Sequence, residues 1–399
     1  MRKDVDKILA EKGAEAIFLY SESVKEANMY YLTKFLAPDP FIYLKKVGEE
    51  PILIVSQMEY SRAKKESIIK NVCSYMDYNI HEIIKAAPDP KIGSLKLLAN
   101  VAKKELGMGT KICVPPNFPA IIVDALRSEG LTIMPMFDVV EKARETKEPD
   151  ELQAIQEVQA IVDKVTKKVI DLIADADVDN KGRLVVRIDG RREVLTVGKV
   201  KVMLGHEFLD NGCASEDPIV ACGPRGADPH YSGSPEDELM ANQPIILDIY
   251  PQSIRKRYYT DMTRTIVKGK APKEIKKMFE AVLEARNASI DAIRAGVLGN
   301  EPYNICCDVF EKAGYATTRG GKQITKGFTH GLGHGVGLQV HEGPSLSEFY
   351  KFALEEHNVV TVEPGLYDPK LGGVRIEDTV EVSKKGCNNF VKTEILLEI

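Results

Sequence analysis

The first 140 residues alternate between short apolar runs and stretches with helical spacing of apolar positions. Five runs are typical of buried strands and lie at residues 16–20, 41–46, 51–56, 111–114 and 131–136. Helical patterns occupy residues 1–13 and about 58–68, 93–106 and 118–129. Strands that alternate with helices predict an α/β domain in this part of the chain.

A highly charged run at residues 141–158 follows this region. Within it, Pro149 is followed by Asp150 and Glu151, a typical helix start, because proline fits the first turn and acidic side chains favour a helix N-terminus. Apolar residues then recur at helical spacing towards Ala174. We therefore place a domain boundary here, with a first domain of residues 1–140 and a second of residues 141–399.

Strand patterns dominate the chain beyond about residue 180. Two helical stretches interrupt them, at about residues 272–295 and 301–314. The remaining candidate strands lie at residues 243–250, 261–267, 358–363, 373–382 and 390–398. Because these strands outnumber the helices, we predict an α+β domain with a curved, mainly antiparallel sheet.

Length and charge narrow the classes of function. A chain of 399 residues is too long for one ordinary core, which favours two domains. Its formal net charge of -5 predicts no general attraction to nucleic acid or to an anionic membrane. No segment has the apolar length of a membrane span, and the N-terminal pattern differs from that of a signal peptide. We expect a cytoplasmic protein with a small-molecule or peptide partner.

The candidate chemistry lies in one histidine-rich segment and four carboxylates. The segment HGLGHGVGLQVHE, residues 330–342, holds three of the seven histidines and four glycines. Histidine binds metals and carries protons near neutral pH, and we expect the glycines to leave room for a substrate. The carboxylates lie at the ends of candidate strands and are Asp248 in IILDIY, Asp261 in YYTDMTRT, Glu363 in TVEPGLY and Glu377 in VRIEDTV.

The spacing of these residues predicts that they meet. Asp248 closes one apolar run and Asp261 opens the next, so a hairpin would bring both carboxylates to one end of a sheet. Arg375 and Glu377 are two apart in a strand-like run and should share a face. Any one of these carboxylates alone is more often a helix cap or an ion-pair member. Their combination with a histidine predicts a metal site.

Charge balance predicts two metal ions. Four converging carboxylates would repel each other and become protonated without cations, whereas two divalent ions offset four negative charges. Ligation by oxygen with one imidazole suits Mn²⁺ or Co²⁺ at least as well as Zn²⁺, and Fe²⁺ is a further alternative.

The motifs resemble those of a known family. HGLGHGVGLQVHE is similar to the histidine signature of proline-directed peptidases in the M24, or "pita-bread", metallopeptidase family. LDIY, TDMTRT, VEPGLY and GVRIED resemble its other metal motifs, in the same order along the chain. The resemblance covers about residues 150–399, and the first domain resembles the creatinase-type domain of Xaa-Pro aminopeptidases and prolidases.

The resemblance implies a role for each metal ligand. Asp248 and Asp261 would hold one ion, with Asp261 bridging to the second; His334 and Glu363 would ligate the second ion alone, and Glu377 would bridge both. The expected nucleophile is a water between the ions. Glu363 would also accept the proton of this water.

The resemblance also implies residues around the substrate. His330, His341 and His230, the last in GADPHYSG, would lie around the peptide and stabilise the intermediate or pass a proton to the leaving nitrogen of proline. Arg375 has two interpretations that stay open: an ion pair with a neighbouring carboxylate, or a functional role in which it recognises a substrate carboxylate or orders the site. Members of this family are commonly homodimers, which we therefore expect here.

Two departures from the family concern substrate choice. The family usually has glycine where this chain has Tyr250 and Pro251, and the interval from Asp248 to Asp261 is about two residues longer.

The expected function is hydrolysis of the bond before proline, in dipeptides or at longer N-termini. Alternatives are a methionine aminopeptidase, a creatinase-like hydrolase without metal, and a non-enzymatic binding protein. The presence of all five ligands disfavours the last two.

Overall fold

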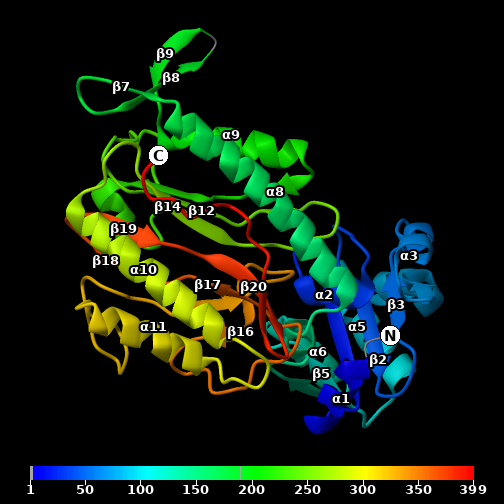
Figure 1. Cartoon of the computed structure of the whole chain (residues 1–399). Helices are drawn as coiled ribbons and strands as arrows, with labels where there is room; N and C mark the ends of the chain where they lie inside the picture. The colour runs from blue at the N-terminus through cyan, green and yellow to red at the C-terminus, as the bar shows by residue number, and fades with distance from the viewer. Residues whose placement is uncertain (1–2, 189) are drawn as a thin grey trace. The chain divides into compact units, whose positions relative to one another are not determined.

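The computed structural model describes residues 3–188 and 190–399, and the chain forms two compact units, residues 1–144 and 145–399 (Figure 1). The boundary expected from the sequence lies four residues earlier. Residues 141–144 pack within the N-terminal unit, where Asn28 donates a hydrogen bond to Glu141 and accepts one from Arg144. Their charge resembles that of the following helix, but their contacts are with the first unit.

The N-terminal unit is an α/β domain built on one six-stranded sheet. The strands have the order β4-β3-β2-β1-β5-β6, in which β2 is antiparallel to both β1 and β3 and the other pairs are parallel. Their bounds are β1 (Ala16–Ser21), β2 (Phe41–Lys46), β3 (Ile52–Val55), β4 (Asn71–Ser74), β5 (Lys111–Val114) and β6 (Thr132–Pro135). The five predicted strands are confirmed, and β4 is additional.

The helices of this unit include those predicted and four short ones that were not. Apolar residues of β1, β2, β5, α5 and α6 form its core. The helices are α1 (Lys3–Glu11), α2 (Ala27–Thr33), α3 (Tyr60–Glu66), the 3₁₀ helix η1 (Tyr75–Tyr78), α4 (Ile80–Ala86), α5 (Pro90–Leu106), α6 (Ala120–Ser128) and α7 (Val140–Glu145). The four unpredicted helices, α2, η1, α4 and α7, have four to seven residues, so each shows little apolar repeat in the sequence.

Among the described residues, four α-helices belong to the C-terminal unit: α8 (Pro149–Ala174), α9 (Val197–Asp210), α10 (Lys273–Ala292) and α11 (Asn300–Lys312). The predicted start of α8 is confirmed, because Pro149 opens the helix and Glu148 and Glu151 form a capping box. Helix α9 was not predicted, since its buried face is rich in valine, which also suits strands. Within the described part of the chain, no helix is both long and apolar enough to cross a membrane.

The strands of the C-terminal unit form several antiparallel sheets rather than one. The sheets are β7-β8-β9, β10-β13, β11-β12-β14, β16-β15-β17-β20-β21 and β18-β19. The first eight strands are β7 (Asp177–Val178), β8 (Leu184–Ile188), β9 (Arg191–Val194), β10 (Cys213–Ala214), β11 (Ile219–Cys222), β12 (Ile245–Ile249), β13 (Gln252–Ser253) and β14 (Met262–Ile266), with the 3₁₀ helix η2 (Gly223–Ala227) after β11. The others are β15 (Gly333–Gly335), β16 (Glu342–Leu346), β17 (Val359–Val362), β18 (Gly365–Asp368), β19 (Gly372–Arg375), β20 (Asp378–Ser383) and β21 (Gly386–Asn389).

Each helix pair packs on its own group of strands. Helices α8 and α9 share an apolar core with β8, β11, β12 and β14. Helices α10 and α11 share another with β17, β18, β19 and β20. In Figure 1 strands β12, β14, β17 and β20 lie between α8 and α10. This layered arrangement confirms the predicted α+β class.

Two predicted strands are wrong. Residues 373–382 form β19 and β20, which belong to different sheets, because the chain leaves one ladder at Ile376 and Glu377 and joins another. Residues 390–398 form no ladder beyond one bridge from Glu398 to Val267. There the backbone of Lys392 and Thr393 bonds to side chains of other segments instead of to a strand.

Candidate metal centre

All nine residues predicted for the site line one cavity of about 330 Å³ in the C-terminal unit. They are His230, Asp248, Asp261, His330, His334, His341, Glu363, Arg375 and Glu377. The other walls are mainly apolar or aromatic and include Ile219, Pro229, Tyr250 and Val340. The structure therefore brings the predicted residues together, although they are spread over nearly 150 positions.

Strand pairing explains how the carboxylates meet. Asp248 in β12 pairs with Thr263 of β14, and Asp261 immediately precedes β14, so the predicted hairpin is confirmed. Glu363 follows β17 and Glu377 precedes β20, and these strands pair antiparallel. The end of one strand therefore lies beside the start of the other, which places both glutamates at the same sheet edge.

The glycines of the histidine segment have a different role from the one expected. A Cβ on Gly333 would lie 2.0 Å from the carbonyl oxygen of Thr361, and one on Gly335 would lie 2.1 Å from that of Gly343. Both glycines thus allow β15 to approach its neighbouring strands rather than leaving room for substrate. Only Gly331 of the cavity-lining glycines has its nearest neighbour at an ordinary contact distance, 3.5 Å.

His334 is oriented as a neutral metal ligand. Its Nδ1 lies 3.0 Å from the carbonyl oxygen of Gly335 and must donate to it, which leaves the lone pair of Nε2 available. Nε2 lies 3.7 Å from Asp261 and 3.5 Å from Glu363. Burial lowers the pKa of His334 to about 4, so the ring is neutral at pH 7. A backbone carbonyl that fixes the ligating tautomer is common around protein-bound metals.

The carboxylates behave as the charge count predicted. Burial and the charge of Glu377 raise the pKa of Asp261 and of Glu363 well above their usual ranges. Burial and the charge of Asp248 raise the pKa of Glu377 to about 8. Without a cation, Glu377 is therefore mostly protonated at pH 7, and the same two causes favour the protonated forms of Asp261 and Glu363.

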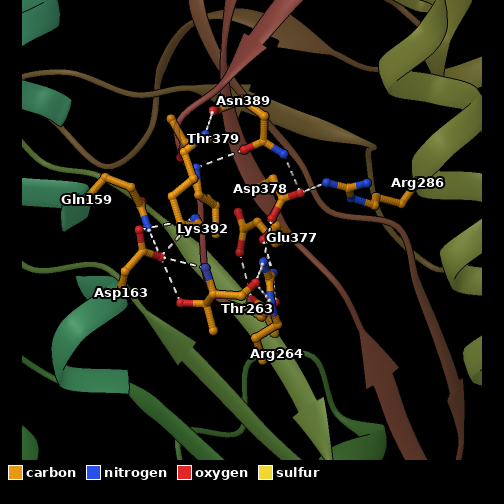
Figure 2. Close-up of polar contacts among 12 residues, drawn as sticks. Gln159, Asp163, Thr263, Arg264, Arg286, Glu377, Asp378, Thr379, Asn389 and Lys392 are labelled. Carbon is orange, nitrogen blue, oxygen red and sulfur yellow. Dashed lines mark hydrogen bonds and ion pairs between the residues drawn. The ribbon is translucent and has the colours of Figure 1, made fainter. Parts of the chain in front are cut away.

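Two carboxylate oxygens in this group have no hydrogen-bond partner among the described residues. Ligand atoms of Asp261, His334 and Glu377 lie within 4.8 Å of one another. Thr263 donates a 2.7 Å hydrogen bond to Oε2 of Glu377 (Figure 2), but Oε1 of Glu377 and Oδ1 of Asp261 are buried without a hydrogen-bond partner among the described residues. Buried polar atoms are rarely left unsatisfied. A divalent cation would satisfy both oxygens and offset the charge, so this donor set fits a metal.

Arg375 is buried in the floor of the site and makes an ion pair. Its Nη2 donates to Asp248 at 2.6 Å, its Nε to Thr263 at 3.2 Å and its Nη1 to the hydroxyl of Tyr367 at 2.8 Å. Only 2% of the residue is exposed. Of the two interpretations of Arg375, the structure contains the ion pair with a neighbouring carboxylate.

Tyr367 is a site residue that the sequence did not reveal. Its hydroxyl accepts from Arg375 and lies 2.8 Å from Nε2 of His330, whose Nδ1 lies 2.7 Å from the carbonyl oxygen of Gly331. Burial lowers the pKa of His330 to about 3, so His330 is neutral, donates through Nδ1 and accepts from Tyr367. Tyr367 belongs to the VEPGLY motif, but only the pairing of β18 with β19 brings it to Arg375.

The remaining two histidines are exposed at the cavity. Neither His230 nor His341 has a ring nitrogen bonded to another described residue, although the ring of His341 contacts that of His334 edge-on at 4.3 Å. Tyr250, at the departure noted in the sequence, lines the same cavity and donates a 2.5 Å hydrogen bond to the carbonyl oxygen of Asp217. The aromatic ring of Tyr250 is thus held at the wall of the site.

Comparison with known proteins identifies the family. Residues 153–384 match metallopeptidase family M24, and residues 1–145 match the creatinase/prolidase N-terminal domain. An Xaa-Pro dipeptidase of Pyrococcus furiosus is 29% identical over 390 residues, 97% of this chain and 96% of that protein. The structure of the Pyrococcus horikoshii OT3 prolidase is 26% identical, covers 99% of both chains and has a TM-score of 0.77. That of an Xaa-Pro dipeptidase from Bacillus anthracis is 25% identical, covers 100% of this chain and 99% of the other, and has a TM-score of 0.81. The resemblance and the fold class are confirmed, and the chain belongs to metallopeptidase family M24.

Proposed function

We propose that this metallopeptidase is a dinuclear Xaa-Pro dipeptidase, which hydrolyses the bond before proline in dipeptides. The observation that carries the proposal is the single cavity lined by five candidate ligands and three further histidines. Two buried carboxylate oxygens among the candidate ligands have no hydrogen-bond partner among the described residues. Relatives named Xaa-Pro dipeptidase that match almost the whole chain support the same activity.

In this proposal, Asp248, Asp261, His334, Glu363 and Glu377 hold two divalent ions, Mn²⁺ or Co²⁺ with Zn²⁺ or Fe²⁺ as alternatives. Bound metal would supply a water activated as nucleophile and polarise the scissile carbonyl. Four carboxylates and one neutral imidazole match the charge of two such ions and favour hard or borderline cations. Arg375 then orients Asp248 through their buried ion pair.

In this proposal, different residues of the chain carry out the proton transfers. Glu363 lies beside His334 and is desolvated, so in our proposal its carboxylate takes a proton and returns it. His341 and His230 present unbonded ring nitrogens at the cavity, which suits them to donate to the substrate and to the leaving nitrogen of proline. Both nitrogens of His330 are already bonded within the protein, so its role in this scheme is to shape the substrate side of the site.

Cavity size favours a dipeptide over a longer peptide. Ligand pockets span about 300 to 1,000 Å³, and this one lies near the lower limit. The ring of Tyr250, fixed through its hydroxyl, takes up part of the space. An Xaa-Pro aminopeptidase, which accepts longer peptides, is the second candidate, because the metal residues do not separate the two activities.

The test is an assay of metal-reconstituted protein with Ala-Pro, Ala-Pro-Ala and Met-Ala. Cleavage of Ala-Pro alone supports the dipeptidase, and cleavage of Ala-Pro-Ala supports the aminopeptidase. Turnover of Met-Ala alone would contradict both. His334→Ala should abolish activity, whereas Arg319→Lys, at a surface ion pair, should retain it. A homodimer and a cytoplasmic location remain predictions for sedimentation and cell fractionation.

A further inference from the structure

A buried cluster of charged and amide side chains lies next to Glu377 (Figure 2). We call it the Asp378 cluster, and it consists of Arg264, Arg286, Asp378 and Asn389. Asp378 is fully buried, and its carboxylate accepts hydrogen bonds from Arg264 at 2.8 Å, from Asn389 at 2.8 Å and from Arg286. None of these residues lines the cavity, so catalysis as described does not use them.

Arg264 connects this cluster to the metal-binding residues. All five of its N–H groups are used: Nη1 bonds the carbonyl oxygens of Thr263 and Glu377, Nη2 bonds Asp378 and Thr393, and Nε bonds Thr393 again. Arg264 is only 3% exposed. Its planar guanidinium therefore holds two separate segments, those of Thr263 and Glu377, in one fixed geometry.

The held segments determine where the carboxylate of Glu377 points. The amide of Glu377 donates to the carbonyl oxygen of Thr263 at 3.0 Å, and the Thr263 hydroxyl donates to Oε2 of Glu377. With Oε2 fixed, the unpartnered Oε1 remains as the ligand atom. Glu377 lies at the break between β19 and β20, where no ladder of its own would fix its backbone.

We propose that Arg264 and Asp378 are positioning residues that set the metal affinity of the site by orienting Glu377. The inference rests on the proposed role of Glu377 as a metal ligand. The buried carboxylate of Asp378 orients the guanidinium of Arg264, and Arg264 in turn fixes the main chain on both sides of the Thr263–Glu377 hydrogen bond. Residues that orient metal ligands in this way typically change metal affinity by about 10- to 100-fold when they are replaced.

The experiment titrates metal-free protein with Co²⁺, followed by calorimetry and by the visible absorption of the bound ion. Asp378→Asn keeps the side-chain shape but removes the charge that Arg264 pairs with. We expect its Kd for Co²⁺ to rise by about 10- to 100-fold, with a changed absorption spectrum. Far-UV circular dichroism without metal should match the parent protein. Arg183→Lys, at a surface ion pair with Asp179 and Glu238, is the control and should leave the Kd unchanged.

Each outcome decides the question. A folded Asp378→Asn variant with the parent's Kd and spectrum overturns the inference, and so does an equal loss of affinity in the Arg183→Lys control. If Asp378→Asn does not fold, the isosteric Thr263→Val variant removes the hydrogen bond to Oε2 of Glu377, and an unchanged Kd there also overturns the inference. If the parent protein binds no Co²⁺, the proposed metal site itself is wrong.

Discussion

Metal binding should release protons from the site, and the number can be worked out from the carboxylates. Glu377 has a pKa of about 8 without metal, so it is about 0.9 protonated at pH 7 and about 0.1 at pH 9. A ligand must lose its proton before it binds a cation. Asp261 and Glu363, whose pKa values are also raised, bring the upper limit at pH 7 to about three protons. His334 is already neutral and contributes none.

The assay is calorimetric titration of Mn²⁺ into metal-free protein in two buffers of different ionisation enthalpy, repeated at pH 7 and pH 9. We expect release of between about one and three protons per chain at pH 7, and at least about 0.8 fewer from Glu377 at pH 9. Any proton lost from bound solvent adds to the count. Binding at pH 7 without net proton release would therefore refute the claim that crowded, desolvated carboxyls hold protons in the empty site.

Three further predictions concern stability and the shape of the site. The pKa of Glu377 is higher in the folded than in the unfolded chain, so its contribution to stability is complete below pH 4.5 and is lost as the pH rises through 8. Denaturant unfolding of metal-free protein should show a loss of about 1 kcal/mol between pH 7 and 8, where unfolded histidines are mostly neutral, and added Mn²⁺ should remove this slope. Tyr367→Phe removes one hydrogen bond to a guanidinium and one to an imidazole and should lower the free energy of unfolding by about 3 kcal/mol. The control Tyr43→Phe, whose hydroxyl has no hydrogen bond to a described residue, should lower it by less than about 0.5 kcal/mol. Equal losses in the two variants would contradict the assigned contacts of Tyr367. Gly333→Ala places a methyl group against the carbonyl oxygen of Thr361 and should displace β15. Because β15 carries His334, Mn²⁺ binding measured by calorimetry should weaken at least about tenfold. Unchanged binding would show that β15 can shift without moving His334.

Local patterns predicted most of the elements, because apolar spacing reports which face of an element is buried. The same signal failed for α9, whose valines also suit a strand, and for residues 390–398, where backbone N–H groups bond the side chain of Asp163 instead of a neighbouring strand. Such partners cannot be seen along the sequence. Their identity depends on which distant segments meet after folding.

The candidate site also combines residues that the sequence reveals with residues that only the folded structure reveals. The five proposed ligands were recognisable because their residue types and order resemble the metal motifs of the family. Tyr367 and Arg264 were not singled out, because a tyrosine or an arginine in a strand-like run has no visible partner. Arg264 bonds a carbonyl 129 positions away, and only the folded chain reveals it. The glycines near His334 were recognised as special, but their reason, close contact between strands, also required the structure.

The hydrogen bonds between Asp163 and Thr393 join the first helix of the C-terminal unit to a segment near its other end. Arg264 bonds the same Thr393, so the support of the metal ligands closes only when this late segment is in place. All five proposed ligands lie at or before residue 377, yet the hydrogen bonds that hold Arg264 are incomplete without Thr393. A chain that ends between residues 377 and 393 would therefore contain every proposed ligand and should still bind metal more weakly than the full chain.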